Sequence, residues 1–199
     1  MDFEIRPSNW TEVDSMIKVI GVGGGGCNAV NYMYRKKIEG CSFVVCNTDL
    51  QALQNSPVPV KLHIGRDSLG AGTDPTKGRN AAIEAVKEIE TTVLGPETRM
   101  LFITAGMGGG TGTGAAPIIA KMAKDRGILT VAVVTIPFKN EGSEALGKAA
   151  DGLQELRKNV DSMLIINNEK LYEFFGDTLI QDAFPKADEV LATAVRGIT

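Results

Sequence analysis

The stretch Ala105-Gly-Met-Gly-Gly-Gly-Thr-Gly-Thr-Gly114 determines how the rest of the chain is organised. The mostly apolar segment 99–104 before it predicts a buried strand, and residues 115–124 after it predict a helix. Glycine lets the backbone approach a ligand closely, while the N–H groups and the dipole of a helix N-terminus favour negative charge. A turn needs one or two glycines rather than six, so the run predicts an anion site. The expected ligand is a polyphosphate.

Composition sets limits on the function. The 199 residues can bury a substantial core, as one large domain or as a domain with an appendage. A net charge of −3, with acids and bases interspersed, lacks the basic footprint of a nucleic-acid partner. Three cysteines without a CxxC motif favour a reducing compartment over disulfides or zinc. No leader peptide or apolar run of ~20 residues is apparent, so we expect a cytoplasmic protein without direct membrane insertion.

A second strand–glycine–helix unit lies near the N-terminus. Residues 16–22 predict a strand, a glycine run follows at once, and a helix is expected over 28–38. The dinucleotide fingerprint GxGxxG is satisfied by Gly21, Gly23 and Gly26. This short motif is weak by itself. It leaves open a Rossmann oxidoreductase that binds NAD, although that interpretation does not account for the glycine run at 106–114.

Polar residues Asn47 to Asp49 follow the strand predicted over 42–46, at the sheet edge where α/β proteins bind ligands. Two interpretations of Asp49 stay open. It caps the short helix expected over 50–54, or it lies beside a phosphate or a metal. His63, the single histidine, falls within the next strand, where packing is favoured over catalysis.

A third glycine-bearing loop, Gly65 to Gly78, precedes a helix expected over 79–92. The segment 142–149, GSEALGKA, is one residue short of the phosphate-loop pattern GxxxxGK[ST]. Because it is rich in helix formers, we predict a helix there instead. Further strands are expected at 127–136 and 161–168.

Alternating strands and helices predict the α/β class, with a Rossmann-like parallel six-stranded sheet flanked by helices. Every glycine-rich loop follows a strand, so the loops gather at one edge of the sheet. Three such loops together can enclose a whole triphosphate.

Several motifs resemble the tubulin/FtsZ GTPase superfamily. They are GVGGGGCNAV at 21–30, CNTDLQAL at 46–53, GAGTDP at 70–75, AGMGGGTGTGAAP at 105–117, PFKNEG at 137–142, INNEKL at 166–171 and DAFPKADEVL at 182–191. The resemblance covers residues 16–199. It implies a domain that binds GTP or GDP with Mg²⁺ and polymerises head to tail. It also implies a bacterial division ring at midcell, with tethering and regulatory proteins as further partners.

The same resemblance implies a set of site residues. Diphosphate and base positions are matched by Gly24, Gly25, Gly26, Cys27 and Asn28, the γ-phosphate loop by Gly70, Ala71 and Gly72, and the signature loop by Gly106, Gly108, Gly109, Gly110, Thr111, Gly112 and Thr113. The ribose contact is matched by Glu141, the guanine-reading pair by Asn168 and Asp188, and the stacking ring by Phe184. Asn47 and Asp49 complete the site, with Asp49 as a candidate to hold Mg²⁺ through water.

Two positions depart from the family pattern. The family usually carries an arginine where this chain has Ala145, and an apolar or aromatic residue where it has Asn140. Both changes predict a weaker grip on the ribose and the γ-phosphate.

The expected organisation is a flexible tail over 1–14, a GTP-binding domain over 15–187, and the start of a central helix over 188–199. The family's acidic loop and second domain would lie beyond that helix. No catalytic residue is therefore expected in this chain, since the neighbouring subunit's acidic loop orients the water. A nucleotide-binding structural module without turnover stays open as the other alternative.

Overall fold

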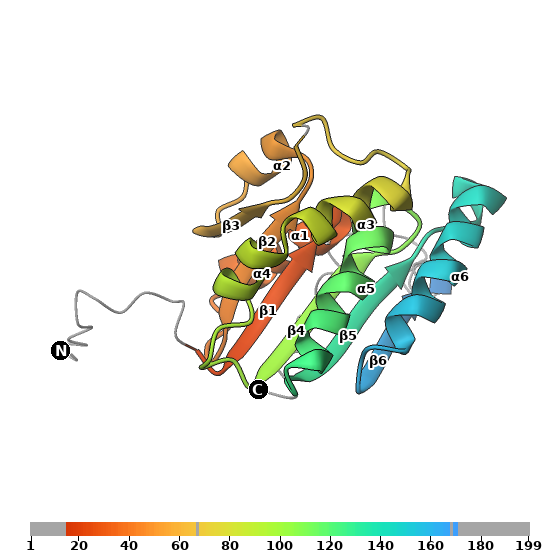
Figure 1. Ribbon diagram of the computed structural model, residues 1–199. Helices are drawn as coiled ribbons and strands as arrows, with labels where there is room; N and C mark the ends of the chain where they lie inside the picture. Colours follow the sequence, from red (N-terminus) through yellow and green to blue (C-terminus); the bar gives the residue numbers. More distant parts are fainter. Residues whose placement is uncertain (1–14, 67, 168, 171–199) are drawn as a thin grey trace.

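The computed structural model describes residues 15–66, 68–167 and 169–170 (Figure 1). The expectations for residues 1–14 and 188–199 lie outside the described residues. Within the described part, no helix is both long enough and apolar enough to cross a membrane.

A six-stranded parallel sheet forms the centre of the molecule, in the order β3-β2-β1-β4-β5-β6. The strands are β1 (Ile17–Val22), β2 (Ser42–Asn47), β3 (Val60–His63), β4 (Met100–Gly106), β5 (Leu129–Ile136) and β6 (Ser162–Asn167). This confirms the predicted fold class. The chain builds outward from β1 to β3, then returns to the other side of β1 with β4. The boundary between β1 and β4 is thus a topological switch point, where open α/β sheets bind ligands.

Helices cover both faces of the sheet. They are α1 (Gly23–Arg35), α2 (Leu50–Gln54), α3 (Pro75–Glu84), α4 (Val86–Thr92), α5 (Gly110–Asp125) and α6 (Ser143–Arg157), with a short 3-10 turn η1 (Lys139–Glu141) before α6. In Figure 1, helices α3 to α6 lie over the face of the sheet toward the viewer.

Alternate residues of each strand enter two separate cores, as the period of a strand requires. On one face Val19 and Phe102 pack against Met33 of α1. On the other face Ile20 and Ile103 pack with residues of α3, α4 and α5. Both faces of the central strands are buried, which explains why their sequences are mostly apolar.

Two predicted helix boundaries were wrong. The helix expected over 28–38 begins at Gly23, so the N-terminal glycine run is the first turn of α1 rather than a loop. The helix expected over 79–92 is two helices, with a break at Ala85. It begins early because the Asp74 side chain caps it, accepting a hydrogen bond from Thr76 N at 2.9 Å. The helix predicted over 142–149 is confirmed as the start of α6.

Helices α3 and α5 meet backbone to backbone through two glycines. A Cβ atom on Gly114 would overlap Pro75 O and lie 2.7 Å from Arg79 N. A Cβ atom on Gly78 would overlap Gly110 O. This contact fixes the loop before α3 against the start of α5.

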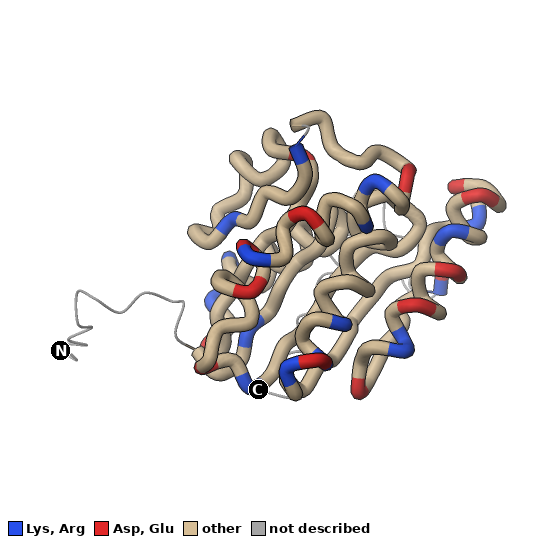
Figure 2. The backbone as a smooth tube through the Cα atoms, viewed as in Figure 1, with Lys and Arg blue, Asp and Glu red and all other residues tan. Residues whose placement is uncertain are grey.

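Both acidic and basic residues occur in most of the helices of the described part. Figure 2 shows acidic and basic residues intermixed along the helices. This is the distribution that the near-neutral composition predicts.

We expect Gly114→Ala to lower the free energy of unfolding by about 1–3 kcal/mol, because the methyl group overpacks a backbone contact. Urea denaturation measures the change. Gly147→Ala is the control, since a Cβ atom at this exposed position of α6 meets nothing within 4 Å. It should be neutral or more stable by about 0.5–1 kcal/mol. Equal effects of the two substitutions would contradict this account of the α3–α5 contact.

Candidate anion-binding site

The carboxyl ends of β1, β2 and β4 meet at one edge of the sheet. Val22 pairs in register with Cys46 on one side and with Ala105 on the other. The segments that follow these strands therefore start side by side. They are the first turn of α1, residues 47–49, and the turn that leads into α5.

The predicted glycine segments converge at this edge. A Cβ atom on Gly25 would lie 3.2 Å from Gly106 Cα, and one on Gly23 would lie 2.8 Å from Gly112 N. Gly110 N, at the start of α5, donates a hydrogen bond to Gly72 O at 2.9 Å. Two helix N-termini and the loop 70–74 thus surround one region.

The glycines divide into two groups by what a Cβ atom would meet. A Cβ on Gly26 would overlap Thr104 O, and one on Gly112 would lie 2.5 Å from Gly106 O, so these glycines are required by packing. At Gly24 and Gly109 a Cβ would meet nothing within 4 Å, and both residues are exposed. Gly109 has a φ of −85°, which any residue adopts. Neither packing nor backbone conformation demands glycine at these two positions, and the missing side chains leave open space at both helix N-termini.

Electrostatics at this edge suit an anion. Helices α1 and α5 direct their N-termini toward it, and neither has an acidic residue in its first turn. The dipoles of both helices therefore add positive potential that no carboxylate of those first turns offsets.

Thr48 connects the segments of the site. Its Oγ1 accepts a hydrogen bond from Ala71 N at 2.8 Å and lies 2.7 Å from Thr111 Oγ1. Its own N–H donates to Asn47 Oδ1 at 2.9 Å. The sequence pattern indicated both neighbours of Thr48 as site residues, but not Thr48 itself. The available signal was a small hydroxyl residue between two polar residues, directly after a buried strand.

Asn47, Asp49 and His63 have structural contacts at this edge. Asp49 Oδ1 accepts from Ala52 N at 3.0 Å, which confirms the capping interpretation. His63 is the last residue of β3, and its ring Nε2 forms a hydrogen bond with Thr48 O at 3.1 Å. Among the described residues, no group of three His, Cys, Asp or Glu side chains could hold a metal. A metal at Asp49 would therefore depend on ligand oxygens.

Thr111 and Thr113 are the two threonines of the glycine run at 105–114. Both are buried, and Thr113 Oγ1 accepts a hydrogen bond from Gly108 N at 2.8 Å. This bond closes the turn in which Gly108 takes a φ of +106°. The threonine hydroxyls thus hold the backbone in the form that exposes Gly109.

The Cys27 side chain is buried where α1 packs against the ends of β1 and β2. Its Sγ donates to Gly21 O and Cys46 O, each at 3.5 Å. Burial raises the pKa of the Cys27 thiol to about 12, so the thiol stays neutral near pH 7. Asn28, the next residue, is exposed.

The segment after β5 borders the site on the α6 side. Glu141 is exposed, and its Oε1 accepts from Phe138 N at 2.9 Å. A Cβ atom on Gly108 would lie 3.1 Å from Ala145 O, so α6 begins close to the signature turn. The remaining predicted site residues, Asn168, Phe184 and Asp188, lie outside the described residues.

Comparisons with known proteins agree with this architecture. Residues 16–176 match the tubulin/FtsZ family, GTPase domain. Cell division protein FtsZ of Porphyromonas gingivalis is 49% identical over 203 residues, which cover 100% of this chain and 44% of that protein. The protein of the same name from Aquifex aeolicus is 52% identical, covering 92% of this chain and 50% of its own length. The chain spans about half the length of these curated relatives.

A solved structure described as an empty FtsZ dimer of M. jannaschii superimposes with a TM-score of 0.85 at 43% identity. The match covers 92% of this chain and 53% of that one.

We expect Gly109→Val to fold normally and to lose at least about tenfold in affinity for a nucleoside triphosphate, because its side chain fills the open space of the site. Calorimetric titration measures binding, and a thermal melt checks the fold.

Gly110→Val serves as the contrast. A Cβ atom there would lie 2.7 Å from Gly72 O and 2.8 Å from Ala71 O, so this variant should lose stability as well as binding. A folded Gly109→Val variant with unchanged affinity would place the anion site elsewhere.

Proposed function

This chain belongs to the tubulin/FtsZ family, and on that premise we propose that it is the GTP-binding part of a tubulin-like cell-division GTPase. The observation that carries the proposal is the pair of open glycines, Gly24 and Gly109, at two helix N-termini beside the switch between β1 and β4. A polyphosphate bound there receives backbone N–H groups from both helices. Backbone donors are fixed by the fold before the ligand arrives, so little ordering is needed on binding.

The loop 70–74 reaches the terminal phosphate in this proposal. The hydrogen bond from Gly110 N to Gly72 O supports this assignment, because it joins the loop to the start of α5. Thr48 supports the same loop through Ala71 N. Loss of the terminal phosphate would leave the loop without its ligand, so the loop is the part of the site that distinguishes GTP from GDP.

Asp49 fits a Mg²⁺ ion that the phosphates themselves hold. Mg²⁺ usually keeps several waters and takes one or two carboxylates together with phosphate oxygens. Asp49 is half-buried beside Thr48, and its Oδ1 serves the cap of α2. We propose that Oδ2 accepts from the water shell of the metal, which neutralises charge on the phosphates when bound.

In this proposal, guanine and ribose are recognised by the residues that match the family's base and ribose positions. Asp188 accepts from guanine N1–H and N2–H₂, Asn168 supplies an amide, and Phe184 stacks on the base. Adenine lacks this donor pair, so it would leave the Asp188 carboxylate unpaired. Glu141 accepts from the ribose.

Hydrolysis in this proposal needs two subunits. Phosphoryl transfer to water requires positioned phosphates, charge neutralisation and a group that orients the water. Among the 199 residues, no carboxylate matches the acidic pair with which the family orients water. We propose that a neighbouring subunit that carries the family's acidic loop supplies it in a head-to-tail polymer at the division site, where tethering and regulatory proteins bind.

GTP should bind to the 199-residue chain at least about a hundredfold more tightly than ATP or NAD, because only guanine satisfies a site built for its donors. Asp188→Ala should weaken GTP binding by about 1–3 kcal/mol, as expected for an unpaired buried donor. Calorimetry with the three ligands decides. Preferential binding of NAD would favour the oxidoreductase interpretation, and unchanged GTP affinity in Asp188→Ala would remove the base assignment.

The 199-residue chain alone should hydrolyse GTP at a rate near background. Phosphate release measures this rate. Addition of a full-length relative with an intact acidic loop and a disabled pocket should raise it, because the two proteins then complete one site. Rapid turnover by the chain alone would contradict the need for a second subunit. An absence of stimulation would favour a binding module without turnover.

A further inference from the structure

Lys148 of α6 makes a contact that the proposed function does not use. Its Nζ donates a hydrogen bond to Thr73 O at 2.8 Å, across 75 positions of sequence. It also donates to Glu144 Oε1 at 2.6 Å. The Lys148 side chain is 24% exposed, so most of its length is held against the protein.

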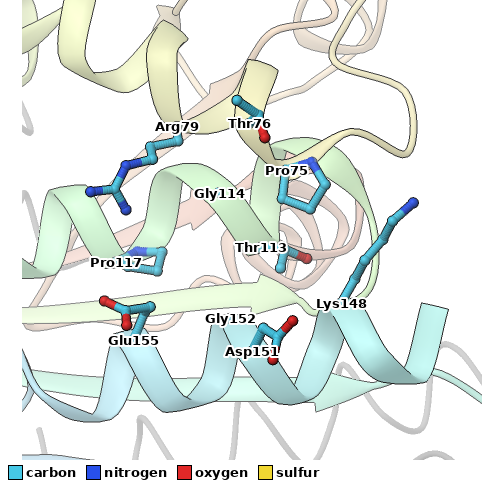
Figure 3. A pocket seen from close by; sticks show the side chains of 10 residues that line it. All are labelled: Pro75, Thr76, Arg79, Thr113, Gly114, Pro117, Lys148, Asp151, Gly152 and Glu155. Carbon is cyan, nitrogen blue, oxygen red and sulfur yellow. The ribbon is translucent and has the colours of Figure 1, made fainter. Parts of the chain in front are cut away.

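The position of α6 directs this side chain. Glu144, Lys148 and Gly152 are spaced by four residues and share one face of the helix. Gly152 lets α6 approach α5, since a Cβ there would lie 2.5 Å from Thr113 Cγ2 and 2.8 Å from Met107 Cε. Figure 3 shows Lys148 extending from α6 toward the segment that leads into Pro75. Lys148 also lines a cavity of about 230 Å³ between α3, α5 and α6.

The partner carbonyl belongs to a tight turn. Asp74 N donates to Ala71 O at 3.1 Å, so Thr73 lies inside the turn that forms the loop 70–74. Among the described residues, three hydrogen bonds join this turn to distant parts of the chain. Thr48 holds Ala71 N, Gly110 N holds Gly72 O, and Lys148 holds Thr73 O. The first two come from the phosphate site itself, whereas the third comes from α6.

Glu144 makes the contact directional. Its carboxylate accepts from the same ammonium group, which orients the remaining N–H bonds, and a charged donor strengthens the bond to the carbonyl. Ala71 is buried, whereas Gly72, Thr73 and Asp74 are exposed, so the outer part of the loop depends on hydrogen bonds more than on packing.

We propose that Lys148 is a positioning residue that holds the loop 70–74 over the terminal phosphate of the nucleotide. The inference rests on the proposed function, because it assumes that the loop contacts that phosphate. Lys148 acts through Thr73 O and not on the ligand. Its removal therefore affects a triphosphate, which needs the loop, more than a diphosphate, which does not.

The test compares GTP and GDP affinity, each with Mg²⁺, in Lys148→Met and in the unmodified chain. Methionine keeps the apolar stem and removes the charged donor. Calorimetry should show GTP affinity reduced about tenfold, the size expected for one charge-assisted hydrogen bond, with GDP affinity within about twofold. Lys148→Arg retains charge and donors, so it should restore most of the GTP affinity.

Lys158→Met is the matched control. Lys158 lies at the end of the same helix and makes an ion pair of the same length, 2.6 Å, with Glu155. Its removal should leave the ratio of GTP to GDP affinity unchanged. If both variants changed the ratio of GTP to GDP affinity alike, the cause would be a general effect of positive charge on α6. That result would overturn the positioning role of Lys148.

Hydrogen exchange supplies a readout without nucleotide. The amides of Ala71 and Asp74 should exchange faster in Lys148→Met than in the unmodified chain, while amides in the sheet keep their rates. Unchanged loop exchange, or equal losses of GTP and GDP affinity, would overturn the inference. These failures differ from that of the proposed function, in which the unmodified chain itself would bind neither nucleotide.

Discussion

Backbone contact without side chains, at the carboxyl edge of the sheet, is the constraint on which the rest of the structure depends. Gly26 lies against the Thr104 carbonyl and Gly112 against the Gly106 carbonyl, both too close for a Cβ atom. These contacts allow α1 and α5 to begin directly beside the ends of β1 and β4. Because the helices begin there, their N–H groups and dipoles meet in one place. Backbone contact also joins α3 to α5, and Gly152 brings α6 against the side chains of Thr113 and Met107, so the loops around the site are attached to one centre.

Glycine within a helix costs about 1 kcal/mol per residue relative to alanine, so two glycine-rich first turns are a considerable expense in stability. Packing accounts for the glycines whose Cβ atoms would overlap neighbouring backbone. It does not account for Gly24 or Gly109, which face open space. Helix propensity would favour alanine at Gly24 in the first turn of α1, and a polar cap such as serine or aspartate would suit Gly109, the N-cap of α5, at least as well as glycine. A ligand that approaches the backbone would explain glycine at both positions.

The sequence predicted the features that depend on local pattern. Six apolar segments became six parallel strands, and the strand–glycine–helix order predicted that the glycine segments converge at one edge of the sheet. The features that it did not predict depend on contacts between distant residues. Thr48 and Thr111 meet across 63 positions, and Lys148 meets Thr73 across 75. The early start of α1 also needs the neighbouring strand, since glycine propensity alone argues against a helix there. The base-reading residues 168, 184 and 188 stay predictions.

The central claim is that an anion binds among the backbone amides of the two glycine-rich helix starts. Amide chemical shifts of the ¹⁵N-labelled chain, recorded during a titration with GDP, test this most directly. We expect the largest shifts at Gly24, Gly25 and Gly109, with small changes over β6 and over the outer turns of α6. Two results would contradict the account. One is that the shifts are concentrated around the cavity between α3, α5 and α6, and the other is that the glycine amides do not shift at saturating GDP.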